Sequence, residues 1–147
     1  MTTVAVVERL KGSDLIGRSY TPPFSYYVGH AKSHVVLAAD YVTTEDGTGL
    51  VHQSPAFGED DMVVGRAYGL PVVNPVTTDG HFTDGVPLVG GQFFRHANTD
   101  LVADLEQRGL LFRHLPYEHS YPHCWRCHTA LLYYAQPSWY VRTTAVK

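Results

Sequence analysis

The stretch from residue 47 to residue 71 constrains the fold more than any other part of the sequence. It opens with the glycine turn 47–49, continues through Leu50 and Val51, and then passes the rigid Pro55. Three consecutive acids at 59–61 suit the start of a helix, because exposed amides and the helix dipole favour negative charge there. A glycine at 69 and a proline at 71 end that helix. The stretch therefore predicts a short strand, a turn and a helix over 59–68.

A second helix ends at Gly109 and is predicted from apolar residues at helical spacing: Phe94, Ala97, Leu101 and Leu105. Short segments rich in valine and aromatic residues between turn residues are typical of strands. We expect such strands at residues 3–7, 15–20, 35–39, 41–44, 50–52, 111–114, 131–134 and 139–142, with another beginning at residue 82. Short strands with two inserted helices predict an α+β fold, a small β-barrel or twisted mixed sheet.

The composition is that of one folded domain over 1–147. The chain has 147 residues, of which 44% are hydrophobic and 17% charged, so it is long enough for a core and unlike a disordered segment. No apolar run approaches a membrane span and the first residues lack signal-peptide features, so we expect a cytoplasmic protein without a membrane partner. The net charge of −3 argues against strong sequence-independent binding of nucleic acids.

The charge is unevenly distributed along the sequence. Five of the nine histidines lie after residue 94, where basic residues also outnumber acidic ones. A polynucleotide partner would use this second half of the chain, although ordinary scatter explains the asymmetry equally well.

His52 and Asp61 are the candidate catalytic residues. His52 ends a predicted strand and Asp61 lies in the first turn of the predicted helix, so a turn at Gly58 would bring both to one pocket. A carboxylate there can bind an ammonium group, and an imidazole can bind a hydroxyl or position water. The alternative is that Asp61 caps the helix and His52 is a packed side chain. The spacing alone favours this alternative.

The glycine turn Gly47, Thr48 and Gly49 is not a nucleotide-binding loop. Such a loop needs either GxGxxG or a following Gly-Lys-Ser/Thr, and neither occurs here. A hairpin turn with glycines at positive φ accounts for the local pattern as well as a pocket wall does.

Cys124 and Cys127 form a CxxC pair with the spacing of metal ligands. Structural zinc takes four ligands, and the nearby candidates are three histidines, of which His128 is poorly placed to complete the same tetrahedron. The pair is therefore either a half zinc site or two reduced, buried thiols. A thioredoxin-like role is less favoured because no strand–CxxC–helix pattern surrounds the pair.

Aromatic residues are concentrated around this cysteine pair and after it. They could stack on nucleic-acid bases, but such residues more often pack in a core or an interface, and we prefer that interpretation. They are Tyr117, Tyr121, Trp125, Tyr133, Tyr134, Trp139 and Tyr140.

Three separated motifs together resemble the isoleucyl-tRNA synthetase family. They are GTGLVHQSPAFGEDD, YGLPVVNPV and HSYPHCWRCHTALLYYAQPSWYV, and KGSDLIGRSYTPPF is similar to the family segment that precedes them. The resemblance is to the editing insertion of the class I catalytic domain and covers essentially the whole chain. It implies the editing-domain fold, truncated at its N-terminal side, with about 117–142 returning toward the catalytic core.

The resemblance also implies a function, namely hydrolysis of mischarged valyl-tRNA(Ile). One methylene group gives weak discrimination, for which isoleucyl-tRNA synthetase is itself the standard example, so a second site removes the error. Asp61 then corresponds to the carboxylate that holds the substrate ammonium, and His52 to the histidine near the ribose and amino acid. Gly47, Thr48, Gly49 and Phe57 correspond to the substrate pocket. The implied partners are the tRNA(Ile) 3′ end carrying valine and the rest of the synthetase.

Several features of the family are missing from this sequence. The threonine-rich peptide of the editing pocket, the HIGH and KMSKS motifs and the second CxxC pair are absent, and Ser54 and Ala130 depart from the family pattern. The chain alone should therefore edit weakly or not at all, and ATP and Mg would act only in the full-length enzyme. The alternatives are a non-catalytic zinc- or RNA-binding module and the editing domain of a valyl-tRNA synthetase.

Overall fold

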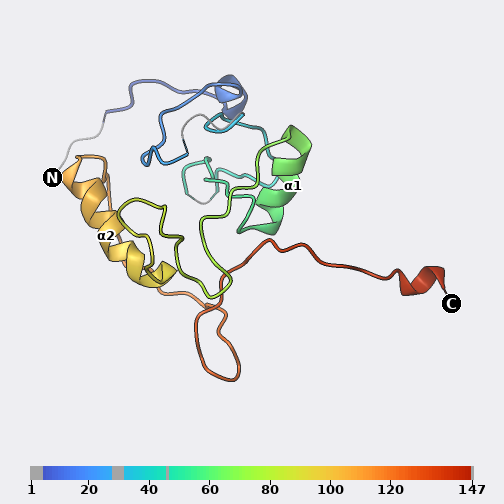
Figure 1. Cartoon of the computed structure of the whole chain (residues 1–147). Coiled ribbons are helices and arrows are strands. Elements are labelled where there is room, and N and C mark those ends of the chain that lie inside the picture. Colours follow the sequence, from blue (N-terminus) through green and yellow to red (C-terminus); the bar gives the residue numbers. More distant parts are fainter. Residues whose placement is uncertain (1–4, 28–31, 46, 147) are drawn as a thin grey trace.

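The computed structural model describes residues 5–27, 32–45 and 47–146, and these residues form helices connected by long irregular segments. In chain order the elements are η1 (Gly12–Leu15), α1 (Glu59–Tyr68), α2 (Phe94–Gln107) and η2 (Thr143–Ala145). Figure 1 shows the last part of the chain leaving the body as an extended arm that carries η2 at its end. Both predicted α-helices are confirmed.

Helix α1 begins and ends where the sequence predicts. Its first turn contains Glu59, Asp60 and Asp61, which face the positive end of the helix dipole. Gly69 has φ of 65° and its N–H contacts the carbonyl oxygens of the last turn, a left-handed conformation that glycine adopts without steric cost. The helix also packs closely on the loop before it, because a Cβ at Gly65 would lie 2.9 Å from Cγ of Pro55.

Helix α2 supplies one side of the small hydrophobic core. Ala97 is fully buried and packs with Val86 and Val89, which come from the loop that precedes the helix. Tyr26, Phe82 and Leu101 are partly buried against this cluster. The predicted apolar face of α2 therefore packs against a loop rather than against a sheet.

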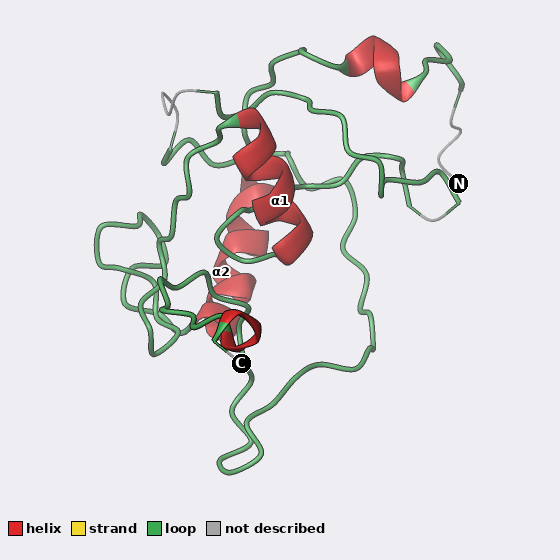
Figure 2. Cartoon of the chain, turned by 90° about the vertical axis from the view of Figure 1, so that its right-hand side faces the viewer, coloured by secondary structure: helices red, strands yellow, loops and turns green. Residues whose placement is uncertain are grey.

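The predicted β-barrel or twisted mixed sheet is wrong. The described residues contain no strand, as the absence of yellow in Figure 2 shows. The extended pairings found are isolated bridges, between Ser19 and Val35, Val76 and Phe82, His81 and Phe93, and His123 and Ala130. The predicted α+β fold class is therefore wrong as well: the described residues form two α-helices packed among irregular segments.

The physical reason is that the predicted strands pair over too few residues to form a ladder and are not covered by a second layer. Residues 17–20 pair with 34–36 through a few backbone hydrogen bonds and go no further. Leu50 and Val51 are 59% and 52% exposed, and Val7 is 96% exposed, so these apolar segments bury little surface. A stable sheet needs three or more strands with a covered hydrophobic face. The first residues of the strand predicted at 3–7 lie outside the described part of the chain.

No helix within the described ranges is long and apolar enough to cross a membrane.

Substitution of Gly65 by alanine should destabilise the fold. Alanine normally favours a helix over glycine, but here the new methyl group would meet the rigid ring of Pro55. We expect a net loss of roughly 1–2 kcal/mol in the free energy of unfolding, measured by chemical denaturation followed by far-ultraviolet circular dichroism.

Gly85 provides the matched control, because a Cβ there would have no neighbour within 4 Å. Gly85→Ala should leave the unfolding midpoint nearly unchanged. A Gly65→Ala protein as stable as the parent would show that α1 is not tightly packed on Pro55.

Candidate functional site

The carboxylate of Asp61 folds back onto the loop that precedes α1. Its Oδ2 accepts a hydrogen bond of 2.9 Å from the backbone N–H of Ser54. A Cβ on Gly58 would lie 2.6 Å from the same oxygen, so only glycine leaves room for this arrangement. The side chain thus stabilises the loop; it does not cap the helix, because its partner is the Ser54 amide rather than an amide of α1.

The second oxygen of Asp61 is much less occupied. Its Oδ1 is 3.5 Å from the hydroxyl of Tyr41, longer than a normal hydrogen bond between oxygens. The Tyr41 hydroxyl in turn accepts a 2.8 Å hydrogen bond from Nε2 of Gln53. Oδ1 therefore keeps lone pairs that a cationic group could use, and Tyr41 and Gln53 form a polar connection leading away from it.

His52 lies on the wall of a cavity with a volume of about 740 Å³. Its side chain is exposed, and Gly49 and Gln53 line the same cavity. Residues 35–39 and 50–51 form an apolar part of the wall, and charged side chains, among them Lys32 and Asp40, also line the cavity. A concave site that combines apolar walls with polar groups suits a small organic ligand.

His52 and Asp61 are not in direct contact. Among the described residues no hydrogen bond joins their side chains, and Asp61 does not line the cavity. Gln53, which follows His52 and lines the cavity, donates to the Tyr41 hydroxyl, and that hydroxyl lies 3.5 Å from Asp61 Oδ1. Sequence reasoning missed both connecting residues, since neither belongs to a recognisable motif.

The predicted glycine turn is present. Gly47 and Gly49 have φ of 73° and 76°, and Thr48 Oγ1 accepts a hydrogen bond from the N–H of Leu50 at 3.3 Å. Of these three turn residues, Gly49 reaches the cavity wall.

Phe57 is directed to a different part of the molecule. Its ring meets that of Tyr134 edge-on, with centroids 6.4 Å apart. The N–H of Ala135 donates a 2.8 Å hydrogen bond to the carbonyl of Ala56, and the Tyr134 hydroxyl donates to the carbonyl of Val76. Phe57 does not line the His52 cavity, and it anchors the C-terminal part of the chain.

Cys124 and Cys127 lie in a tight turn closed by backbone hydrogen bonds. The N–H of Cys124 donates to the carbonyl of Thr129, and that of His128 donates to the carbonyl of Cys124, both at 2.9 Å. His128 has φ of 57°, and both thiols are free. Within the described ranges no group of three or more His, Cys, Asp or Glu side chains could hold a metal, so these residues do not complete a zinc site.

The environment of Cys127 lowers the pKa of its thiol. The main cause is the side chain of Thr129, followed by the backbone of the same residue and then Cys124. The Cys127 thiol donates to Thr129 Oγ1 at 3.2 Å, and after deprotonation the threonine hydroxyl can donate to the thiolate instead. Hydrogen bonding to the charged form favours that form.

The chain is similar to isoleucine–tRNA ligases of several bacteria, although no protein-family model matches it. The enzyme of Streptomyces coelicolor is 68% identical over 136 residues, which are 92% of this chain. That of Thermobifida fusca is 62% identical over 140 residues, or 95% of the chain. That of Corynebacterium diphtheriae is 52% identical over 136 residues. The chain belongs to the isoleucine–tRNA ligase family.

The family assignment confirms the resemblance seen in the sequence. The chain spans only about 13% of the length of these relatives, so it corresponds to one segment of an isoleucine–tRNA ligase. Similarity alone therefore does not assign the activity of the full-length enzymes to this chain.

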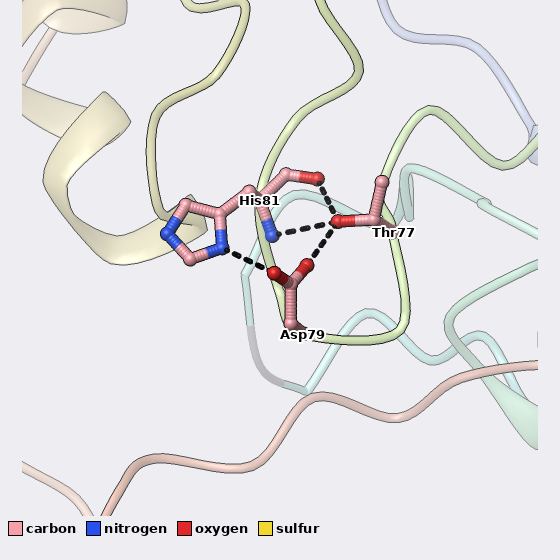
Figure 3. Close-up of polar contacts among 3 residues, drawn as sticks. All are labelled: Thr77, Asp79 and His81. Atoms are coloured by element: carbon pink, nitrogen blue, oxygen red, sulfur yellow. Dashed lines mark hydrogen bonds and ion pairs between the residues drawn. The ribbon is translucent and has the colours of Figure 1, made fainter.

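A polar cluster not singled out from the sequence lies before α2 in this segment of the synthetase. The hydroxyl of Thr77 contacts the Asp79 carboxylate and, at 2.8 Å, the carbonyl of His81 (Figure 3). His81 Nδ1 lies 3.4 Å from Asp79 Oδ2, an ion pair when the imidazole is protonated. The hydrogen bond from Thr77 is the main cause that lowers the pKa of Asp79; desolvation opposes it, and His81 lowers this pKa further. These contacts close the turn of residues 77–81.

Cys127 should be alkylated at a lower pH than an ordinary thiol, because the thiolate is the nucleophile. Substitution of Thr129 by valine removes the hydroxyl that most lowers the Cys127 pKa. We expect the pH midpoint of Cys127 alkylation by iodoacetamide, followed by mass spectrometry, to rise in the Thr129→Val variant.

Thr83→Val is a suitable control, since it makes the same change outside the cysteine turn. An identical midpoint in the parent and in Thr129→Val would show that the hydroxyl does not stabilise the thiolate.

Proposed function

We propose that this segment contributes part of the site at which an isoleucine–tRNA ligase hydrolyses valyl-tRNA(Ile). The observation that carries the proposal is the Asp61 carboxylate, fixed through Oδ2 and left with a weakly occupied Oδ1. An aminoacyl ester presents one ammonium group, and a positioned carboxylate can bind it in a defined register. The similarity to isoleucine–tRNA ligases supports the ligase part of the proposal.

Hydrolysis of an aminoacyl ester makes few chemical demands on the site. The ester is already activated, so hydrolysis needs an oriented substrate and a positioned water rather than a covalent nucleophile. In the proposed arrangement Asp61 holds the ammonium group, and His52 at the cavity wall binds a ribose hydroxyl or positions the water. The apolar wall contributed by residues 35–39 would receive the valine side chain.

Other parts of the proposal concern the longer enzyme. The tRNA 3′ end, the rest of the synthetase, a cytoplasmic location, and ATP with Mg belong to that context. Cys124 and Cys127 are proposed as a half zinc site, whose other ligands would come from outside the described residues. A zinc- or RNA-binding module is the alternative function, and it predicts tRNA binding that is indifferent to Asp61.

Removing the Asp61 charge should abolish most of the editing in a full-length isoleucine–tRNA ligase that carries this segment. We expect Asp61→Ala and Asp61→Asn to slow valyl-tRNA(Ile) hydrolysis by roughly 10- to 100-fold, the magnitude of a lost hydrogen bond to a charged group. Release of valine from preformed valyl-tRNA(Ile) measures this rate.

The two substitutions separate the charge from the structural role of Asp61. Asparagine keeps an oxygen that can accept from the Ser54 N–H, so Asp61→Asn should fold normally and still fail to edit. Asp60→Ala changes the neighbouring exposed acid and should leave hydrolysis intact. Parental rates in Asp61→Asn would remove Asp61 from the proposed site, and preferential hydrolysis of threonyl-tRNA would favour the valyl-tRNA synthetase alternative.

A further inference from the structure

A second cavity lies beside the polar cluster of Thr77, Asp79 and His81, and it shares no lining residue with the His52 cavity. Its volume is about 220 Å³, and it is bounded by the turn 77–80, the start of α2 and residues 129–134. We call it the Asp79 cavity. Pockets for drug-sized ligands typically measure about 300–1,000 Å³, so this cavity suits a smaller molecule.

The charge of the Asp79 cavity is negative. Among the described residues that line it, Asp79 is the one with a charged side chain, and the others are neutral polar, aliphatic or aromatic residues. The cavity therefore favours a ligand with a positive charge. An amino acid or a phosphate ester would also bring a negative group, for which the lining offers no cationic partner and only repulsion from the Asp79 carboxylate.

The Asp79 carboxylate is held in position before any ligand binds. The Thr77 hydroxyl contacts one carboxylate oxygen, and His81 Nδ1 lies 3.4 Å from the other (Figure 3). The turn itself is attached to α2, because the N–H of Phe94 donates a 2.9 Å hydrogen bond to the carbonyl of Gly80. A positioned charge lowers the entropic cost of binding. The side chain is 73% exposed, so a ligand can reach it without rearrangement.

Two phenylalanine rings line the same cavity. The centroids of Phe93 and Phe94 are 4.7 Å apart and their planes are inclined by 52°, so the two rings form a corner rather than a flat surface. Gly80 permits this approach, because a Cβ there would lie only 2.8 Å from Cε2 of Phe93. The turn that carries Asp79 is therefore close to both rings.

Tyr134 brings a third ring from the C-terminal part of the chain. Its hydroxyl donates a 2.8 Å hydrogen bond to the carbonyl of Val76, so the ring rather than the hydroxyl is left for a ligand. Tyr134 is partly buried, in line with the packing role preferred for the aromatic residues of this region. Tyr117 and Trp125 are 84% and 80% exposed, so the same preference is wrong for them.

A carboxylate combined with aromatic rings identifies the class of ligand. The faces of aromatic rings attract organic cations, and quaternary ammonium groups are the cations that aromatic cages bind most typically. A primary ammonium group has three N–H donors that need acceptors. The hydroxyls of Thr77 and Thr129 already have partners in the chain, so a cation without N–H groups suits the cavity better.

We propose that the Asp79 cavity binds a small quaternary ammonium ion that carries no acidic group. The Asp79 carboxylate lies opposite its charge, and the rings of Phe93, Phe94 and Tyr134 contact its methyl groups. The cavity contains neither His52 nor Asp61, and binding requires no ester hydrolysis. The inference therefore stands or falls separately from the proposed editing function.

The test is a titration of the whole, isotopically labelled chain with choline chloride, followed by amide chemical shifts and matched by a titration with sodium chloride. Choline should give saturable shifts at residues 77–80, 93–94 and 129–132. Its uncharged analogue, in which a tert-butyl group replaces the trimethylammonium group, should bind roughly 5-fold more weakly or worse, the factor for one charge contact in water. Glycine betaine, which adds a carboxylate, should also bind more weakly than choline.

Variants separate the charge from the rings. Asp79→Asn should weaken choline binding roughly 5-fold or more, and asparagine keeps an oxygen that can accept from Thr77, so the turn should persist. Phe94→Leu should weaken binding by roughly 2- to 5-fold, as expected for the loss of one cation–π contact. Tyr134→Phe should bind like the parent, because the ring is retained. Asp60→Asn is the matched charge control, since Asp60 is an exposed acid of α1 outside the cavity, and it should leave the affinity unchanged.

Several results would overturn the proposal. They are the absence of saturable shifts at the cavity residues, shifts confined to the His52 cavity, and equal binding of choline and its uncharged analogue. Unchanged affinity in Asp79→Asn, with the helices intact by circular dichroism, would also overturn it. If Asp79→Asn does not fold, Phe94→Leu decides the question in the same way, because parental affinity in that variant would exclude the rings from the site.

Discussion

The loop of residues 54–57 holds together the parts of this molecule that lie far apart in the sequence. Asp61 binds its first amide, α1 packs on Pro55, and the carbonyl of Ala56 accepts a hydrogen bond from Ala135. Ala56 is only 1% exposed, so its hydrogen bond with Ala135 is shielded from water. The geometry of the proposed ester site and the attachment of the C-terminal arm therefore depend on the same four residues.

The helices could be predicted because their signals are local. The acids at 59–61, the left-handed Gly69 and the spacing of Ala97 and Leu101 each act within one or two turns. The sheet could not be predicted correctly, since a strand is stable only with partners that local patterns do not reveal. Leu50 and Val51 have the composition of a strand but remain more than half exposed.

The candidate site was predictable in its residue types but not in its connections. The carboxylate, the imidazole and the glycine turn were visible in the sequence, whereas Tyr41 and Gln53, which join Asp61 to the cavity wall, were not. Phe57, which the resemblance assigns to the substrate pocket, contacts Tyr134, a residue far away in the sequence. Side chains that meet across many residues of sequence depend on tertiary packing, which a motif does not encode.

The placement of the two tryptophans has a consequence for spectroscopy. Trp125 and Trp139 are the two indoles of the chain, and both project into solvent, at 80% and 102% exposure. Intrinsic indole emission would therefore monitor the cysteine turn and the C-terminal arm, and would change little when α2 separates from Val86 and Val89. Melting curves recorded by that emission and by helical ellipticity should not coincide, even if the helical core unfolds in a single cooperative step.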